Sequence, residues 1–256
     1  MRFLGIFAAV FLLSAPCFAA ELSRLDQIVE KGVLRVGTTG DYPPFTMSDK
    51  ATGQFSGFHI DLVQSLATSL GVKIEYVQTS WPNLMKDIEA DMFDIAIGGI
   101  SITLERQKKA FFTVPYSRDG KAPVARCADK DKFDSLEKMD QPGVRAIVNP
   151  GGTNEKFTKT NLKQATVTVF PDNTKIFEEI IAGRADVMIT DGIETRYQQK
   201  IHPGVLCATR PGQYFDFYEK AYLLPRDMIW KNYVDQWLHI QIENGTVKAL
   251  YAKWVD

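Results

Sequence analysis

Apolar runs alternate along the chain with segments in which apolar residues recur every three to four positions. Residues 32–40, GVLRVGTTG, are an apolar run that ends in turn residues, and residues 57–71 have apolar side chains at helical spacing before a terminal glycine. This alternation predicts strands followed by helices, which is typical of α/β proteins. Residues 94–102, DIAIGGISI, are almost entirely apolar and predict a strand that is covered on both faces.

The same order of elements begins again in the second half of the chain. Residues 143–162 predict a strand, a glycine-rich turn and a helix, and residues 165–200 predict strand, helix, strand and helix. Two such units predict two lobes, with the chain crossing near residues 115–123 and returning near residues 215–224. Ligands of such folds bind beyond the carboxyl ends of the strands, here between the lobes.

The expected domain organisation follows from these crossings. Residues 21–117 and 221–256 are assigned to lobe 1, and residues 118–220 to lobe 2. Within lobe 1, residues 81–93 predict a helix with Pro82 in its first turn, where the missing N–H costs nothing. Apolar spacing after residue 228 predicts terminal helices.

Residues 1–20, MRFLGIFAAVFLLSAPCFAA, have the pattern of a secretory signal peptide. One arginine precedes an apolar run from Phe3 to Leu13, and small residues allow cleavage after Ala19 or Ala20. The apolar run is shorter than the ~20 residues that a membrane-spanning helix needs. We therefore expect a periplasmic protein whose mature form is not inserted in the membrane.

The composition indicates an ordinary globular protein, with 256 residues of which 45 % are hydrophobic and 24 % charged. A net charge of −1 produces no strong field that would recruit nucleic acid. His59, His202 and His239 are not spaced as metal ligands, and no phosphate-binding glycine signature occurs. We expect neither a metal nor another cofactor.

Cys127 and Cys207 remain once Cys17 is removed with the signal segment. A pair of cysteines in an oxidising compartment favours a disulfide, which would close a loop of roughly 80 residues and stabilise the fold by about 4 kcal/mol. The sequence does not place the two sulfurs together, so two buried free thiols are the alternative.

Two carboxylates lie at the end of a predicted buried strand, in the segment ITDGIETR. Asp191 follows an apolar run and could hold a ligand's ammonium, and Glu194 comes three residues later. Glu194 could be a second ligand contact or an acid in a reaction. The spacing alone favours a solvated helix position beside Arg196.

Two predicted helix starts carry groups that suit a bound carboxylate. Thr103 can cap a helix whose first turn contains Arg106. A cation there opposes the helix dipole, which a bound carboxylate would explain, although a solvent-facing arginine beside Glu105 is the alternative. Residues 151–157, GGTNEKF, bring glycines and a capping Thr153 to a helix N-terminus, which is a natural anion site.

Five motifs occur in the order found in a known family. GVLRVGTTGDYPPF, GFHIDL, DIAIGGISITLERQKKAFFTVPY, NPGGTNEKF and ADVMITD resemble the periplasmic polar-amino-acid-binding proteins over essentially the whole mature chain. The resemblance implies an α/β, two-lobed periplasmic-binding-protein fold of type II, the Venus-flytrap fold, with two crossover strands. It also implies that Arg106 and Thr153 hold the ligand's α-carboxylate and that Asp191 holds its ammonium.

The chain departs from the receptor pattern at Glu194, where receptors usually have a small or apolar residue, and at Asn149, where they often have glutamine. The segments SWPNLM, GISITLERQ, IVNPGGTNEKF, TDGIE and YVDQWLHI resemble dehydratases of cyclohexadienyl acids that are built on this scaffold. That resemblance implies conversion of prephenate to phenylpyruvate and of arogenate to phenylalanine, with loss of water and carbon dioxide. It favours Glu194 as the general acid.

A general acid is needed because hydroxide is a poor leaving group, and a protonated carboxyl group converts it to water. An ordinary glutamate, with a pKa of about 4.3, is ionised near neutral pH. Exclusion of water and the charge of Asp191 would raise the pKa of Glu194, whereas a substrate ammonium or a nearby lysine would lower it. The sequence leaves this balance open.

The expected site combines these residues with aromatic walls for a ring, although Tyr42 and Trp81 are each also explained as core residues. We expect catalytic roles for Glu194 and Asn149, and substrate binding by Tyr42, Trp81, Ser101, Arg106, Lys121, Thr153, Asn154 and Asp191. Aromatisation drives the reaction, so no cofactor is expected. The expected partners are prephenate and arogenate. A periplasmic amino-acid-binding receptor of an ABC transporter is the alternative.

Overall fold

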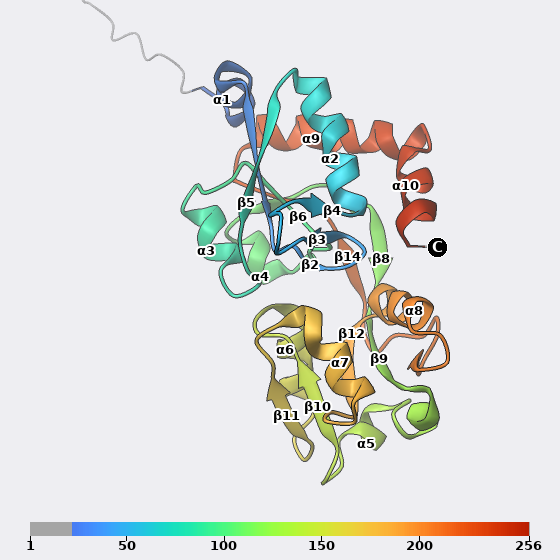
Figure 1. Cartoon of the computed structure of the whole chain (residues 1–256). Coiled ribbons are helices and arrows are strands. Elements are labelled where there is room, and N and C mark those ends of the chain that lie inside the picture. The colour runs from blue at the N-terminus through green and yellow to red at the C-terminus, as the bar shows by residue number, and fades with distance from the viewer. Residues whose placement is uncertain (1–21, 256) are drawn as a thin grey trace, which may run out of the picture.

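The computed structural model describes residues 22–255, so the expected signal segment lies outside the described residues. Two lobes lie one above the other, each built around a five-stranded mixed sheet (Figure 1). The two-lobed α/β fold predicted from the sequence is therefore confirmed. The lobe boundaries given above stay a prediction.

The upper lobe contains the sheet β5-β1-β6-β15-β7, in which β1 is parallel to β5 and β6 whereas β15 is antiparallel to both its neighbours. Its strands are β1 (Val33–Thr38), β5 (Lys73–Gln78), β6 (Ile95–Ile97), β7 (Phe111–Phe112) and β15 (Leu223–Leu224). Its helices are α1 (Arg24–Lys31), α2 (Phe58–Leu70), α3 (Leu84–Glu89), α4 (Leu104–Gln107), α9 (Met228–Glu243) and α10 (Thr246–Trp254). A small sheet adds β2 (Asp41–Tyr42), β3 (Thr46–Ser48) and β4 (Phe55–Ser56).

The lower lobe contains the sheet β11-β10-β12-β9-β13, with β10 parallel to β11 and β12 and with β9 antiparallel to its neighbours. Its strands are β9 (Lys121–Arg126), β10 (Arg145–Val148), β11 (Thr166–Val169), β12 (Val187–Asp191) and β13 (Leu206–Ala208). Its helices are α5 (Leu136–Met139), α6 (Gly152–Asn161), α7 (Ile176–Ile181) and α8 (Gly192–Ile201), with 3₁₀ turns η1 (Cys127–Lys132) and η2 (Asn173–Lys175).

Two antiparallel strands join the lobes. β8 (Ser117–Asp119) runs toward the lower lobe, and β14 (Tyr218–Lys220) pairs with it on the way back. These are the two crossover strands that the sequence predicts. Because they lead directly into β9 and come just before β15, they bring side chains of the crossover next to the ends of both sheets.

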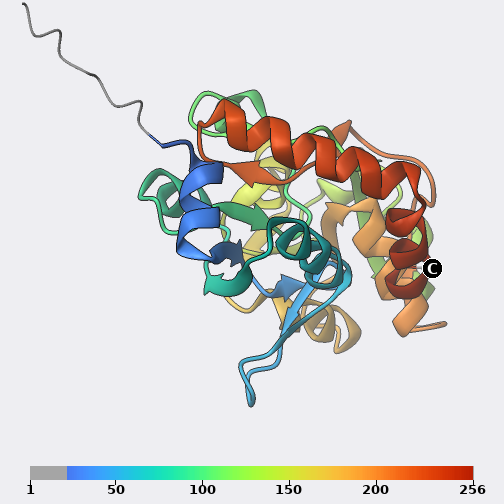
Figure 2. The ribbon, with the colours of Figure 1, turned by 90° about the horizontal axis from the view of Figure 1, so that it is seen from above.

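Helices α2 and α9 cover one face of the upper sheet, and α3 packs on the other face through Leu84 and Ile88. Leu62 and Leu66 of α2 pack with Val36 of β1, and Trp230 and Leu238 of α9 belong to the same buried cluster. Figure 2 shows α9, in red, lying along the top of the molecule with α1 near one end and α10 near the other. The apolar periodicity that predicts these helices therefore corresponds to their buried faces.

Three local predictions are wrong. The strand expected over 94–102 is β6 alone, because Gly98 and Gly99 have φ values of 123° and 75° and end it. Pro82 lies before α3, whose N-cap is Asn83, rather than in its first turn. Thr153 does not cap α6, because Gly151 is the N-cap residue.

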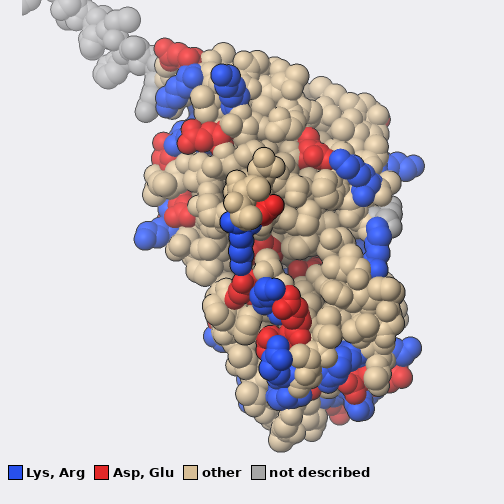
Figure 3. Space-filling view, in the orientation of Figure 1, with Lys and Arg blue, Asp and Glu red and all other residues tan. Residues whose placement is uncertain are grey.

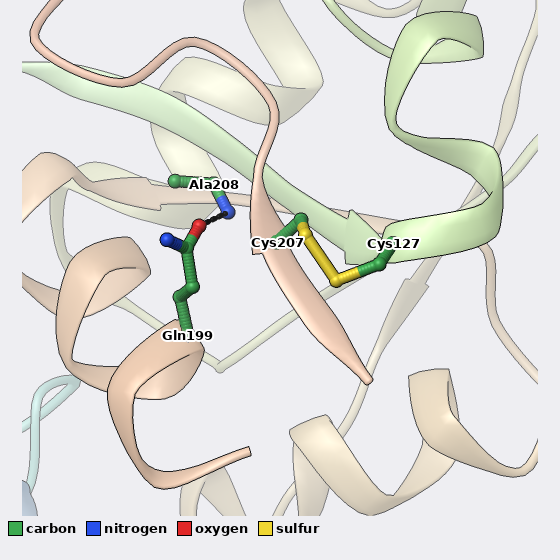
Figure 4. Close-up of a disulfide and its surroundings, with 4 residues drawn as sticks. All are labelled: Cys127, Gln199, Cys207 and Ala208. Carbon is green, nitrogen blue, oxygen red and sulfur yellow. Dashed lines mark hydrogen bonds between the residues drawn. A yellow bond between two sulfur atoms is a disulfide. The ribbon is translucent and has the colours of Figure 1, made fainter. Parts of the chain in front are cut away.

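A disulfide joins Cys127 at the end of β9 to Cys207 in the adjacent strand β13, with an S–S distance of 2.13 Å (Figure 4). Next to it, Ala208 N–H donates a hydrogen bond to Gln199 of α8 over 2.9 Å. The hydrogen bond holds α8, which begins directly after Asp191, against the edge strand β13 of the lower sheet.

Charged side chains of both signs are interspersed on the face shown in Figure 3. Neither sign covers a lobe on this face, in keeping with the near-zero net charge. Among residues 22–255, no helix is both long enough and apolar enough to cross a membrane.

Candidate active site

A small, partly open cavity of about 20 Å³ lies between the two lobes. This volume holds roughly one water molecule, so a substrate can enter only when the lobes move apart. Of the ten predicted catalytic and binding residues, eight line it and two, Lys121 and Glu194, do not. The lining residues are Tyr42, Trp81, Gly99, Ser101, Arg106, Asn149, Gly151, Gly152, Thr153, Asn154, Asn173 and Asp191.

Two aromatic side chains form one wall of the cavity. The rings of Tyr42 and Trp81 meet edge to face, with their centroids 5.7 Å apart. Trp81 Nε1 donates to Asp41 Oδ1 over 3.0 Å, which fixes the plane of the indole. Burial raises the pKa of Asp41, against the hydrogen bonds that it accepts. The wall offers an apolar face to a ring.

Arg106 supplies a cation to the cavity. Thr103 caps α4 by accepting a hydrogen bond from Arg106 N–H over 3.2 Å, as the sequence predicts. The guanidinium donates to the Ser101 carbonyl over 2.9 Å and forms no ion pair with a carboxylate of residues 22–255. Arg106 is therefore available to a substrate carboxylate.

Asp191 is buried at the end of β12 and is surrounded by donors. Its Oδ1 accepts a hydrogen bond from Lys121 Nζ over 2.6 Å, and its Oδ2 accepts from Lys220 Nζ and from Tyr42 OH, each over 2.5 Å. The register of β9 and β12 sets Lys121 directly opposite Asp191. Burial alone would raise the pKa of Asp191, but the two lysines hold it well below its usual value.

A chain of hydrogen bonds leads from Lys121 to Glu194. Lys121 Nζ donates to Thr153 Oγ1 over 2.9 Å and to Asn154 Oδ1. Asn154 Nδ2 donates to Thr190 Oγ1 over 3.0 Å, and the Thr190 hydroxyl donates to Glu194 Oε2. Thr190 therefore lies between Glu194 and Asn154, which lines the cavity.

Asn149 lies at the same end of the lower sheet, in the loop after β10. Its Oδ1 accepts a hydrogen bond from Asn154 Nδ2 over 3.3 Å, and its side chain lines the cavity. The two amides thus form a polar patch opposite the aromatic wall. Such a patch can orient either the substrate or the hydrogen-bonded chain behind it.

Glu194 is 1 % exposed in the first turn of α8, which excludes the solvated position that the spacing favours. Burial raises its pKa to about 8, against the lowering effect of the Thr190 hydrogen bond and of Lys121. Asp191 and Asp41 add to the increase. At neutral pH Glu194 is thus mostly protonated, whereas the neighbouring Asp191 is ionised.

Contacts across the cavity hold the lobes together. Asn173 Nδ2 in the lower lobe donates to the Asp41 carbonyl over 2.9 Å. At the rim, Lys50 pairs with Asp172 over 2.9 Å and Lys156 pairs with Glu105 over 2.7 Å. Exposed pairs of this kind contribute little energy each, so closure depends mainly on the buried contacts of Asp191.

Three functional candidates were missed in the sequence. Thr190 and Asn173 look like ordinary strand and turn residues, because their partners Glu194 and Asp41 are recognised only in the folded chain. Lys220 lies in the segment EKAYLLPRD, which differs from the receptor pattern, but nothing in that segment indicates contact with Asp191.

The fold and the interlobe cavity define a solute-binding protein scaffold, and residues 34–256 match the family of bacterial extracellular solute-binding proteins, family 3. The chain belongs to this family. It is 55 % identical to the cyclohexadienyl dehydratase of Pseudomonas aeruginosa, over 97 % of this chain and 92 % of that protein. It is 26 % identical to the L-cystine-binding protein TcyJ of Escherichia coli K12, over 98 % of this chain and 93 % of that protein.

Solved structures of related proteins have the same fold. A crystal structure of an ancestral amino-acid-binding protein, described as a precursor of cyclohexadienyl dehydratase, has a TM-score of 0.83 and 36 % identity, and covers 91 % of this chain and 100 % of its own. An ancestral cyclohexadienyl dehydratase has a TM-score of 0.58 and 53 % identity, and covers 93 % of this chain and 98 % of its own. The scaffold is thus similar both to an amino-acid-binding protein and to dehydratases.

Proposed function

We propose that this chain is a periplasmic cyclohexadienyl dehydratase, a carbon–oxygen lyase. It converts prephenate to phenylpyruvate and arogenate to phenylalanine in the cavity between the lobes. The identity of 55 % with a named dehydratase supports this assignment, as does membership of an extracellular protein family.

The observation that carries the mechanism is the nearly complete burial of the Glu194 carboxyl group beside the cavity. This group has a pKa of about 8, so it can donate a proton at neutral pH. A receptor that only binds and releases its ligand transfers no proton to it. We infer that a substrate enters while the lobes are open, and that the side chains of Asn154 and Thr190 move aside from the Glu194 carboxyl as the lobes close over it.

The reaction needs one proton and no external electrons. Glu194 protonates the departing ring hydroxyl, and the carbon–oxygen bond breaks to release water. The bond between the ring and its carboxylate also breaks. Its electron pair enters the ring and completes the aromatic system as carbon dioxide leaves. The gain in aromaticity drives the reaction, and no cofactor takes part.

The remaining residues position the substrate. Arg106 and the start of α6 at Thr153 bind carboxylate charge, and Tyr42 and Trp81 enclose the ring. Asn149 and Asn154 orient the polar groups near Glu194. The carboxylate that leaves as neutral carbon dioxide must be bound weakly, since strong binding would stabilise the ground state instead of the transition state.

Turnover separates this function from that of an amino-acid receptor. The purified mature protein is mixed with prephenate, and phenylpyruvate is followed by its absorbance in strong base, with spontaneous breakdown as the control. Repeated turnover above the control is expected. Saturable binding of an amino acid without consumption of prephenate or arogenate would contradict the proposal and establish the receptor alternative.

A further inference from the structure

In the closed protein Asp191 already accepts hydrogen bonds from three donors of the protein, two of which are ammonium groups. Lys121 binds one carboxylate oxygen, and Lys220 and Tyr42 bind the other. A third ammonium beside this carboxylate would face two cations at hydrogen-bond distance. The interaction that holds the ammonium of an amino acid is therefore already made by the protein itself.

Lys220 differs from Lys121 in its position. Lys121 belongs to the lower sheet, and two more of its donors bind Thr153 and Asn154. Lys220 ends the crossover strand β14, is fully buried, and donates to Ser101 Oγ of the upper lobe over 2.8 Å. It thus links Ser101 to Asp191 across the cavity.

We propose that Lys220 is the specificity-determining residue that replaces the ligand's α-ammonium at Asp191. The site then selects acids recognised through their carboxylates, with Arg106 as a partner, and does not hold free α-amino acids. This inference rests on the proposed function and refines its substrate class: a cyclohexadienyl dicarboxylic acid whose keto or amino group makes no required contact.

The proposal accounts for action on both expected substrates. Prephenate and arogenate share two carboxylates and the ring and differ in a keto and an amino group. With Asp191 already paired, the ammonium of arogenate gains no ion pair there. The protein therefore has no large preference for arogenate, and it is unsuited to hold its amino-acid product.

The test compares the wild type with Lys220→Met, which keeps the length of the side chain but removes its charge. Binding of L-phenylalanine and L-arginine is measured by calorimetry, and kcat/KM is measured for prephenate and arogenate. The wild type is expected to bind neither amino acid measurably. Lys220→Met should bind at least one of them and should raise the arogenate-to-prephenate ratio of kcat/KM about tenfold, which corresponds to about 1.4 kcal/mol.

Lys156→Met is the matched control, because it removes one positive charge at the exposed rim of the cavity. It should leave the substrate ratio and amino-acid binding as in the wild type. If the loss of any positive charge near the cavity were enough, both variants would show the same change in amino-acid binding and in the substrate ratio. Such a result would overturn the proposal. The ratio is insensitive to a merely structural defect, which would lower both activities together.

The failures of the two proposals are distinguishable. If the wild type shows no turnover, the proposed dehydratase function is refuted. The measurements of amino-acid binding would still test the proposed role of Lys220. Micromolar binding of an α-amino acid by the wild type would overturn the role of Lys220 whether or not prephenate is consumed. If Lys220→Met does not fold, it is replaced by Lys220→Gln, which keeps donors toward Ser101 and Asp191. An unchanged arogenate-to-prephenate ratio of kcat/KM in that folded variant would also count against the proposal.

Discussion

At the scale of single residues, the site holds two neighbouring carboxyl groups in opposite protonation states. Asp191 is kept ionised by Lys121 and Lys220, whereas burial and the charge of Asp191 keep Glu194 protonated. Pairs of carboxyl groups whose pKa values are pushed apart in this way are a general means of assigning acid and charge-stabilising roles. The environment, rather than the residue type, raises the pKa of Glu194 and suits it to the proposed role of general acid.

The Thr190 hydroxyl controls the strength of this acid. Because its hydrogen bond lowers the pKa of Glu194, Thr190→Val is expected to raise that pKa further above about 8. The acid must be protonated, so kcat/KM falls as the pH rises through the pKa of the free enzyme. In a pH profile of kcat/KM, the fall of Thr190→Val should lie at higher pH than that of the wild type.

Thr195→Val provides the control for this profile. Thr195 is also buried in α8, but its hydroxyl donates to the Gly192 carbonyl over 2.8 Å and does not touch Glu194. Its profile should coincide with that of the wild type. If kcat/KM of Thr190→Val falls at the same pH as that of the wild type, or at a lower pH, a group other than Glu194 sets the pH profile.

The sequence predicts the residues near strand ends and helix starts, but not those that depend on long-range partners. Arg106 and Asp191 are recognised from motifs, and both line the cavity. Lys220 was missed, because its contact with Asp191 depends on how the crossover returns between the lobes. Lys121 and Lys220 both bind Asp191, and the expected role of Asp191 in holding a ligand's ammonium stays a prediction.

At the scale of elements, glycine decides where strands and helices end and how closely the lobes approach. Gly98 and Gly99 shorten β6 relative to its apolar run, and Gly151 begins α6. A Cβ atom at Gly151 would lie 2.7 Å from the backbone nitrogen of Pro82 in the other lobe. An apolar pattern cannot reveal this contact, because it depends on two separate loops meeting.

Gly151→Ala is therefore expected to oppose lobe closure. Gly151 and Gly183 both have a φ of 71°, but a Cβ atom at Gly183 has no neighbour within 4 Å. Both alanine variants should lose stability, by about 1–2 kcal/mol for a left-handed residue such as Gly183 and by more at Gly151, whose ψ of 175° places it in a region that essentially only glycine adopts. Only Gly151→Ala should also lower kcat/KM. The loss should be about tenfold if the free energy of lobe closure becomes less favourable by about 1.4 kcal/mol.

Steady-state kinetics and thermal unfolding of the two variants separate these effects. Equal losses of kcat/KM would show that strain, and not the contact with Pro82, explains the change. Retained activity in Gly151→Ala would show that the lobes do not need to approach as closely as they do here.

At the scale of the whole molecule, two lobes joined by β8 and β14 leave a cavity too small for a ring acid, so we expect the lobes to open and close in each turnover. The predicted alternation of strands and helices yields this architecture, including the crossovers. The closed cavity itself could not be predicted, because it results from contacts such as Tyr42 with Asp191 between distant parts of the chain.

Burial of Glu194 also links global stability to pH. Its pKa rises from 4.5 in the unfolded chain to about 8 in the folded protein, so the folded state holds the proton more tightly. This contribution to stability is fully present below about pH 4.5 and is lost as the pH rises through about 8. Glu194→Gln, which remains neutral, is expected to gain stability relative to the wild type across this range, by a few kcal/mol.

Urea unfolding at a series of pH values measures this difference directly, since the other ionisable groups are common to both proteins. Free energies of unfolding that differ by a constant amount from pH 5 to about pH 9 would contradict the raised pKa.

The central claim is that Glu194 is the acid, and the most direct test compares the wild type with Glu194→Gln near neutral pH. Phenylpyruvate formation from prephenate and calorimetric binding of prephenate are measured on both proteins. The account predicts a loss of kcat on the order of 10²–10⁴-fold in Glu194→Gln, with binding retained. Full turnover in Glu194→Gln would contradict the account and remove Glu194 as the general acid.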